Sequence, residues 1–98
     1  MLVIVTYDVS TVDPKPGARR LRRVAKICES YGIRVQKSVF ECQVGNKELA
    51  EMKIKLADVI DKNKDSLRFY LIDQAMKARI EHIGTNLPID VSEDTLMI

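Results

Sequence analysis

The sequence predicts an α+β protein of ferredoxin-like βαββαβ order, with an antiparallel sheet and both helices on one face. Two segments with helical periodicity, residues 17–31 and 47–62, are separated and flanked by short segments with strand character. At 98 residues the chain corresponds to one domain, whose core is adequate but thin. A domain of this size has room to gain stability by forming a dimer.

The first strand is expected at the start of the chain, where four consecutive aliphatic residues precede Thr6, Tyr7 and Asp8. Because side chains alternate along a strand, Val3, Val5 and Tyr7 would face the helices. The opposite set would form a largely apolar surface: Leu2, Ile4, Thr6 and Asp8. No element of the monomer can cover this surface, which predicts a sheet-to-sheet homodimer.

Residues 17–31 are expected to form the first helix, because apolar side chains recur on one side and Gly32 follows its end. Between Lys15 and Lys37 the chain carries eight basic residues and one acid, Glu29. Such asymmetry indicates a polyanionic partner, and arginines on one helix face suit a phosphate backbone. The alternative is an ordinary solvated helix face. The residues predicted to bind nucleic acid are Arg19, Arg20, Arg22, Arg23, Lys26, Arg34, Lys37 and Phe40.

Residues 33–44 alternate between two faces, which is typical of strand structure. No glycine or proline marks a turn within residues 34–38, so one bent strand and a hairpin near Lys37 both fit. Phe40 alternates with Cys42 and Val44, a pattern that favours core packing of its ring over contact with nucleic acid.

The second half of the chain continues the same order. Gly45 and Asn46 form a turn and helix N-cap, and residues 47–62 form the second helix. Strands are expected at residues 66–73 and 79–83, and Gly84 closes the second of them. The ferredoxin-like domain is thus predicted to span residues 1–84. Residues 85–98 are predicted to form a tail whose edge strand pairs with the partner subunit, the alternative being a frayed terminus.

Composition argues against several classes of protein. Cys28 and Cys42 are too few for a disulfide framework or a zinc knuckle, and their positions suit core thiols. No apolar run approaches the ~18 residues of a membrane span, and the apolar start lacks the basic residues of a signal peptide. A reduced, cytoplasmic setting is the expectation.

Asp8 is the candidate for chemistry. No Ser/His/Asp set, phosphate-binding glycine loop or zinc pattern is present, and the sole histidine, His82, is expected to be structural. Asp8 ends a buried strand, where either a turn residue or a functional carboxylate is common. Two copies of Asp8 across a dimer axis would suit Mg²⁺ or Mn²⁺, an ion that can polarise a phosphoryl oxygen and supply a hydroxide nucleophile.

Several segments together resemble the CRISPR-associated protein 2 family. They are residues 5–9 (VTYDV), 20–26 (RLRRVAK), 31–42 (YGIRVQKSVFEC), 65–70 (DSLRFY) and 82–84 (HIG). The resemblance covers essentially the whole chain in order. The strand that ends in Tyr7 and Asp8, combined with residues 36–41, is the most specific part of it.

The resemblance implies a homodimer of ferredoxin-like subunits that acts in spacer acquisition during antiviral defence. It implies nucleic acid, as duplex DNA or RNA, and the larger integrase, CRISPR-associated protein 1, as partners. It also implies Mg²⁺-dependent endonuclease activity, with Asp8 as the metal ligand and Asp8, Tyr7 and Arg34 as the catalytic residues. An arginine within residues 19–23 and Phe40 also match functional positions of the family.

Three functions therefore compete. The first is a metal-dependent phosphodiesterase with Asp8 at its centre and Arg34 or a helix arginine steadying charge. The second is a non-catalytic scaffold that holds duplex DNA along the basic helix and docks the integrase. The third is a toxin-type ribonuclease, since that related branch shares the segment at residues 35–41.

Overall fold

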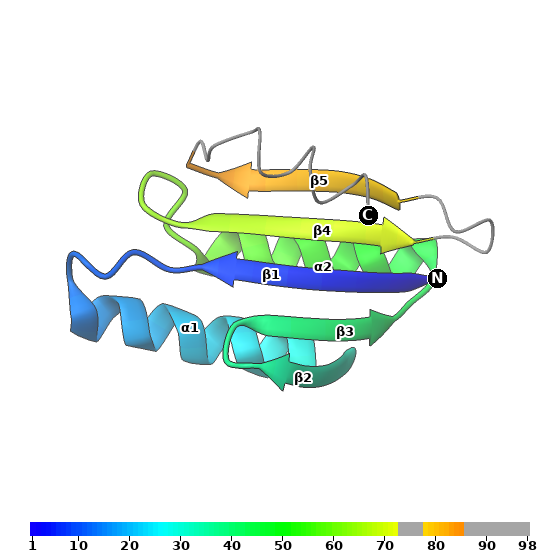
Figure 1. Cartoon of the computed structure of the whole chain (residues 1–98), viewed down its shortest axis with the longest axis horizontal. Helices are drawn as coiled ribbons and strands as arrows, with labels where there is room; N and C mark the ends of the chain where they lie inside the picture. The colour runs from blue at the N-terminus through cyan, green and yellow to red at the C-terminus, as the bar shows by residue number, and fades with distance from the viewer. Residues whose placement is uncertain (73–77, 86–98) are drawn as a thin grey trace.

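The computed structural model describes residues 1–72 and 78–85 (Figure 1). Its elements are β1 (Leu2–Asp8), α1 (Pro14–Glu29), β2 (Gly32–Gln36), β3 (Val39–Gln43), α2 (Asn46–Val59), β4 (Ser66–Ile72) and β5 (Ala78–Gly84). The strands form one sheet in the order β2-β3-β1-β4-β5, and every neighbouring pair is antiparallel. Both helices lie behind this sheet in the view of Figure 1. The predicted ferredoxin-like arrangement is confirmed.

Residues 32–43 form a hairpin, which settles the alternative that the sequence left open. Strands β2 and β3 pair antiparallel, with a register shift between Arg34 and Gln36. The backbone N–H of Tyr7 donates to the carbonyl of Ser38 at 2.9 Å, so the turn is held against the end of β1. Gly32 permits the close approach of the two strands, because a Cβ there would lie 2.0 Å from the carbonyl oxygen of Glu41.

The helices differ from expectation mainly at their ends. Helix α1 begins at Pro14, earlier than predicted, because proline fits the first turn, where its missing N–H forms no helical bond. Helix α2 has Gly45 as its N-cap, and the side chain of Glu48 accepts the Gly45 N–H at 3.0 Å. It ends at Val59 rather than near residue 62. No helix in the described part of the chain is long and apolar enough to span a membrane.

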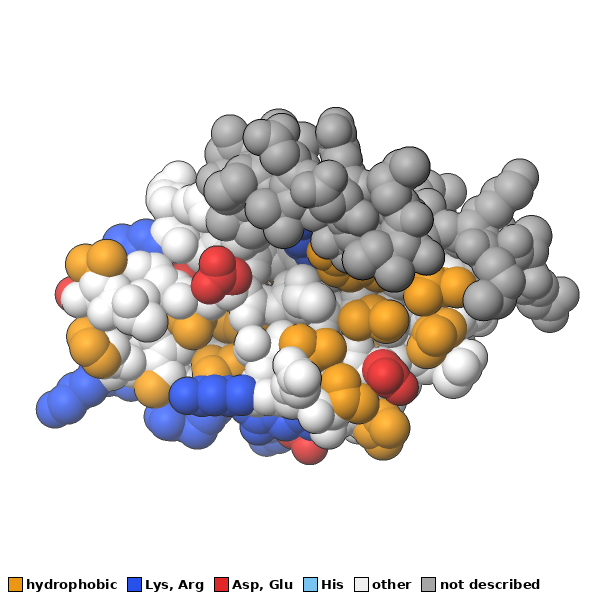
Figure 2. All heavy atoms as spheres, viewed as in Figure 1, with side chains coloured by type: hydrophobic (Ala, Val, Ile, Leu, Met, Phe, Trp, Pro, Cys, Tyr) orange, Lys and Arg blue, Asp and Glu red, His pale blue; other side chains and the backbone are white. Residues whose placement is uncertain are grey.

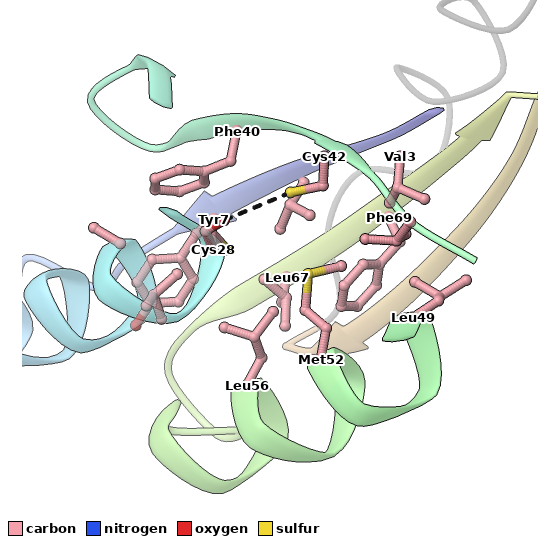
Figure 3. Packing of buried hydrophobic residues seen from close by; sticks show 14 of the residues in the cluster. Val3, Tyr7, Cys28, Phe40, Cys42, Leu49, Met52, Leu56, Leu67 and Phe69 are labelled. Atoms are coloured by element: carbon pink, nitrogen blue, oxygen red, sulfur yellow. Dashed lines mark hydrogen bonds between the residues drawn. The ribbon is translucent and has the colours of Figure 1, made fainter. Parts of the chain in front are cut away.

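The core lies between the sheet and the two helices (Figure 3). Val3, Val5 and Tyr7 of β1 are buried, as predicted, and their partners on β4 (Leu71, Phe69 and Leu67) are buried with them. Helix α2 contributes Leu49, Met52 and Leu56. Cys28 and Cys42 are free, buried thiols, and burial raises the pKa of Cys28 to about 12.

The other face of the sheet carries no helix. Leu2, Ile4 and Thr6 of β1 lie on it and are only partly buried within one chain. Ile4 pairs with Tyr70 of β4, which in turn pairs with Ile80 of β5. Figure 2 shows hydrophobic side chains running across this face, with Lys and Arg side chains along its lower margin. We call it the open face. The predicted tail lies almost wholly outside the described residues.

Gly84 provides a test of how tightly the end of β5 is held. Its φ of +117° disfavours a side chain, and a Cβ would lie 2.1 Å from the carbonyl oxygen of Asp65. We expect Gly84→Ala to lower the free energy of unfolding by about 1–3 kcal/mol, measured by urea denaturation. Gly45→Ala is the control, because the nearest atom to its Cβ is a side-chain oxygen at 3.5 Å. Equal losses in both variants would contradict the prediction.

Candidate metal and nucleic-acid site

Asp8 is the last residue of β1 and its side chain is exposed. It continues the alternation of Leu2, Ile4 and Thr6 and therefore belongs to the open face. Within residues 1–72 and 78–85, no group of three or more His, Cys, Asp or Glu side chains could hold a metal ion. One chain therefore offers Asp8 as a single carboxylate ligand at this place.

A hydroxyl lies beside Asp8 in the sheet, and an imidazole contacts that hydroxyl from the next strand. The partner of Asp8 in the register of β4 is Ser66, which is buried. The Ser66 hydroxyl is hydrogen-bonded to Nε2 of His82 on β5 at 2.8 Å. The sequence assigned His82 a structural role, and spacing alone could not pair it with Ser66, because the contact depends on the register of β4 and β5.

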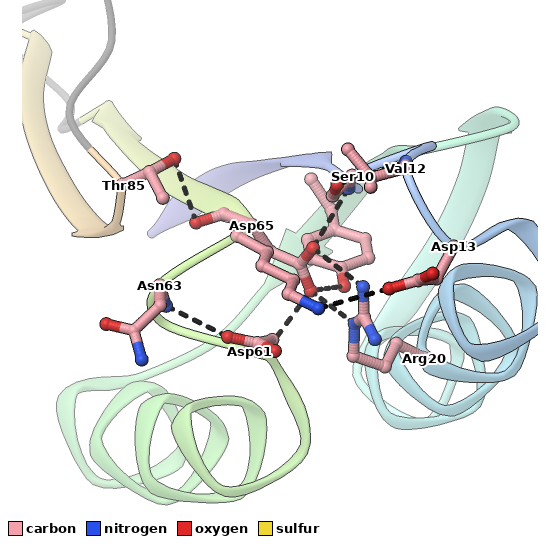
Figure 4. A network of polar contacts seen from close by, with 10 residues as sticks. Ser10, Val12, Asp13, Arg20, Asp61, Asn63, Asp65 and Thr85 are labelled. Carbon is pink, nitrogen blue, oxygen red and sulfur yellow. Dashed lines mark hydrogen bonds and ion pairs between the residues drawn. The ribbon is translucent and has the colours of Figure 1, made fainter.

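Tyr7 is buried and faces the other way, toward Asp65. Figure 4 shows the network of polar contacts around Asp65. The Tyr7 hydroxyl donates to Oδ2 of Asp65. Arg20 donates through Nε to Oδ2 at 2.7 Å and through Nη2 to Oδ1 at 3.2 Å. The backbone N–H groups of Ser10 and Asp61 donate at 2.9 and 3.1 Å. Asp65 thus joins β1, the loop after it, α1 and the loop after α2.

These contacts fix the protonation states in the network. Burial alone would raise the pKa of Asp65, but the hydrogen bonds from Arg20, Ser10, Tyr7 and Asp61 outweigh it and hold the pKa below its usual value. Burial and the Asp65 carboxylate raise the pKa of Tyr7 above its usual value. At neutral pH Asp65 is therefore a carboxylate and Tyr7 a neutral donor. Tyr7 is therefore hydrogen-bonded within the helix side of the sheet, and Asp8 lies on the other side.

The basic residues of α1 divide into two groups. Arg20 is committed to Asp65, and only 15% of its side chain is exposed. The others lie exposed along the helix and can meet a partner: Arg19, Arg22, Arg23 and Lys26. The sequence did not separate Arg20 from its neighbours, because its partner lies 45 residues further along the chain.

Arg34 and Lys37 lie together on the hairpin. Both Nε and Nη2 of Arg34 donate to the carbonyl of Lys37, the former at 2.9 Å. The guanidinium also lies 5.7 Å from the centre of the Phe40 ring. Phe40 itself is fully buried, so its ring supports Arg34 from the core and offers no exposed surface to a base.

Asp8 and the basic residues thus lie on different sides of one strand end. Arg22, Arg34 and Lys37 line a hollow together with residues 9–11, the segment that directly follows Asp8. Asp8 itself does not line this hollow. The chain that links them is clamped at Ser10 by Asp65, so the carboxylate and the basic hollow keep a fixed relation.

Comparison with known proteins gives a consistent result. The profile of the family described as CRISPR associated protein Cas2 matches residues 1–80. The CRISPR-associated endonuclease Cas2 of Halalkalibacterium halodurans is 50% identical over 97 residues, which cover 99% of each chain. The CRISPR-associated endoribonuclease Cas2 of Chlorobaculum tepidum is 49% identical over 98 residues, the full length of both.

A solved structure supports the same relationship. The crystal structure of Streptococcus pyogenes Cas2 at pH 6.5 superposes with a TM-score of 0.70. It is 53% identical in sequence, and the match covers 76% of this chain and 88% of that one. The fold and the sequence therefore point to one family.

The Asp65 network predicts how stability depends on pH. Because the pKa of Asp65 is lower in the folded than in the unfolded chain, its contribution is present above pH ~4 and is lost as the pH falls through the folded pKa. We expect Asp65→Asn to lower the free energy of unfolding by about 3 kcal/mol at pH 7, because it leaves Arg20 without its partner. The difference from wild type should shrink below pH ~4, measured by urea denaturation across a pH series.

Asp13→Asn is the matched control. Asp13 pairs with Lys64 at 3.2 Å, but both side chains are about half exposed. We expect a loss below about 1 kcal/mol there. A difference between Asp65→Asn and wild type that does not change from pH 7 to pH 3 would contradict the assigned role.

Proposed function

Because the chain belongs to the CRISPR-associated protein Cas2 family, we propose that it is a CRISPR-associated nuclease that hydrolyses phosphodiester bonds in RNA or double-stranded DNA. Its relatives from H. halodurans and C. tepidum carry the names endonuclease and endoribonuclease. The observation that carries the proposal in this chain is the exposed Asp8 at the end of β1, on a sheet face that no helix covers.

The open face suits a second copy of the chain. Ile4, Tyr70 and Ile80 lie in one row across β1, β4 and β5 and are only partly buried. Pairing two such faces removes apolar surface from water, and residues beside a two-fold axis meet their own copies. Asp8 lies at the margin of the same face, so a two-fold axis that passes beside Asp8 would bring the two Asp8 carboxylates toward one site.

This donor set fits magnesium in a dimer and not in a single chain. Mg²⁺ typically takes one or two carboxylates, keeps several waters and accepts phosphate oxygens of the substrate. Asp8 from each subunit would supply the carboxylates. When bound, such an ion would stabilise charge on a phosphoryl oxygen and lower the pKa of a bound water.

The remaining steps belong to residues of the chain. The exposed cations on α1 bind phosphates without reading sequence and hold the strand across the dimer. Hydrolysis forms a phosphorus–oxygen bond from water and breaks the bond to the leaving oxygen, which takes up a proton. Arg34 lies on the helix side, so it steadies the phosphate of a neighbouring nucleotide rather than the one that faces Asp8.

The second candidate is a non-catalytic scaffold that holds duplex DNA for the integrase, CRISPR-associated protein 1. The arrangement of the basic residues favours it: the exposed cations of α1 are on the opposite side of the sheet from Asp8. A scaffold needs these cations and the dimer but not the Asp8 carboxylate. A toxin-type ribonuclease needs the carboxylate and cleaves single-stranded RNA without the integrase.

Substitution of Asp8 separates these functions. We expect Asp8→Asn to lower Mg²⁺-dependent cleavage of RNA or duplex DNA by at least about a hundredfold, since it removes the charged ligand. Asp58→Asn, at an exposed position on α2, should cleave as wild type does. The measurement is cleavage of matched RNA and duplex substrates with and without Mg²⁺. Undiminished cleavage by Asp8→Asn would refute the nuclease site. Spacer integration that survives in a cleavage-dead Asp8→Asn would assign the physiological role to the scaffold.

Substitution of Ile4 tests the dimer. A charge in the middle of the open face should oppose its burial, so Ile4→Glu is expected to shift the protein to a monomer in analytical ultracentrifugation. The same variant should lose cleavage, because the two Asp8 carboxylates separate. Ile54→Glu is the control, since Ile54 is 72% exposed on α2. A dimeric Ile4→Glu would exclude the open face as the interface.

A further inference from the structure

A hollow beside the hairpin lies on the helix side of the sheet, and Asp8 does not line it. It encloses about 350 Å³ between the loop after β1, the first turns of α1 and the β2–β3 turn. This volume falls within the range of about 300–1,000 Å³ that is usual for small-molecule sites. Val9, Pro14 and Leu21 give it an apolar lining, and Arg22, Arg34 and Lys37 add three cations.

The charge of the hollow favours an anion with an apolar part. Its lining includes three basic side chains and no acidic one. Arg34 is already oriented, because Nε and Nη2 donate to the carbonyl of Lys37 and the guanidinium rests on the Phe40 ring. The Nη1 group has no part in those two hydrogen bonds and can donate to a phosphate oxygen. Binding would therefore cost little side-chain entropy at this arginine.

Two backbone contacts hold the loop and helix that form the walls of the hollow. The N–H of Ser10 donates to Asp65 at 2.9 Å, which anchors the loop. Gly17 brings α1 against that loop, because a Cβ at this position would lie 2.7 Å from the carbonyl oxygen of Ser10 and 3.3 Å from the side chain of Val9. A neighbouring surface continues along α1 with three cations, Arg22, Lys26 and Arg34, and one acid, Glu29. A strand along this surface would pass the mouth of the hollow.

We propose that this hollow binds one unstacked nucleotide of a bound strand, with its phosphate at Arg22, Arg34 and Lys37 and its base against Val9, Pro14 and Leu21. The inference rests on the proposed function and deepens it, because it distinguishes a site for a single nucleotide from uniform contact with the backbone. Volume, apolar lining and positive charge together match a nucleoside phosphate. A bare phosphate would leave the apolar lining unused.

The probe is adenosine 5′-monophosphate, titrated into the full chain while backbone amide shifts are recorded by NMR. We expect saturable shifts at Thr11, Ala18 and Lys37. Ala18→Leu should weaken this binding by about tenfold or more, because Ala18 lines the hollow and leucine fills it without changing charge. Ala50→Leu is the matched control: it makes the same change at an exposed position on α2 and should bind as wild type does.

Two further probes define the chemistry. Inorganic phosphate and adenosine should each bind at least about tenfold more weakly than the nucleotide, because each uses only half of the site. Equal binding of inorganic phosphate would reduce the hollow to a general anion site and overturn the proposal. Equal binding of the nucleotide to wild type and Ala18→Leu would also overturn it.

Strand binding is measured separately, so that failure of the proposed function remains distinguishable. A duplex with one unpaired, 5′-phosphorylated nucleotide should bind wild type more tightly than a blunt duplex of the same length. Ala18→Leu should lose this preference and still bind the blunt duplex. Loss of all duplex binding by wild type would contradict nucleic-acid binding itself, whereas equal affinity of wild type for the two duplexes would contradict only the nucleotide site.

Discussion

The buried carboxylate of Asp65 is the constraint on which both proposed functional surfaces depend. Its side chain is fully buried, and a buried charge without partners is strongly destabilising. Here the partners come from four segments: Tyr7 of β1, Ser10 of the following loop, Arg20 of α1 and Asp61 beyond α2. If any of these segments moved, the charge would be exposed to solvent or would lose a hydrogen-bond partner. The network therefore fixes the strand end that presents Asp8 and the loop that lines the hollow.

Because side chains alternate along β1, successive residues lie on the helix side and on the open face of the sheet. Tyr7 and Asp8 are adjacent in sequence, yet Tyr7 joins the buried network while Asp8 is exposed. A tyrosine followed by an aspartate at this strand end thus combines a structural anchor with a potential ligand. The same division separates the basic hollow, on the helix side, from the open face. Under the proposed function, nucleic acid on α1 would have to pass around the end of β1 to reach Asp8.

Local periodicity was enough to predict most of the elements, the core face of β1 and the outward position of Asp8. Each of these depends on a pattern that repeats within a few residues along the chain. The alternation of Phe40 with Cys42 and Val44 predicted that Phe40 packs in the core, and Phe40 is buried. The hairpin could not be predicted, because its turn lacks glycine and proline and is held by the contact of Ser38 with Tyr7. The sequence could not distinguish Arg20 from the other helix arginines, because its partner, Asp65, is distant in sequence.

In the proposed arrangement, cation binding and dimerisation are thermodynamically linked. Two Asp8 carboxylates brought together repel each other unless a cation lies between them. The open face must overcome that repulsion with a surface that also carries the exposed Glu41 and Gln43. A divalent ion reverses the sign of this electrostatic term, so it strengthens association by the same factor by which association strengthens its binding. In this proposal a second copy would both add the second Asp8 carboxylate and cover the partly buried open face.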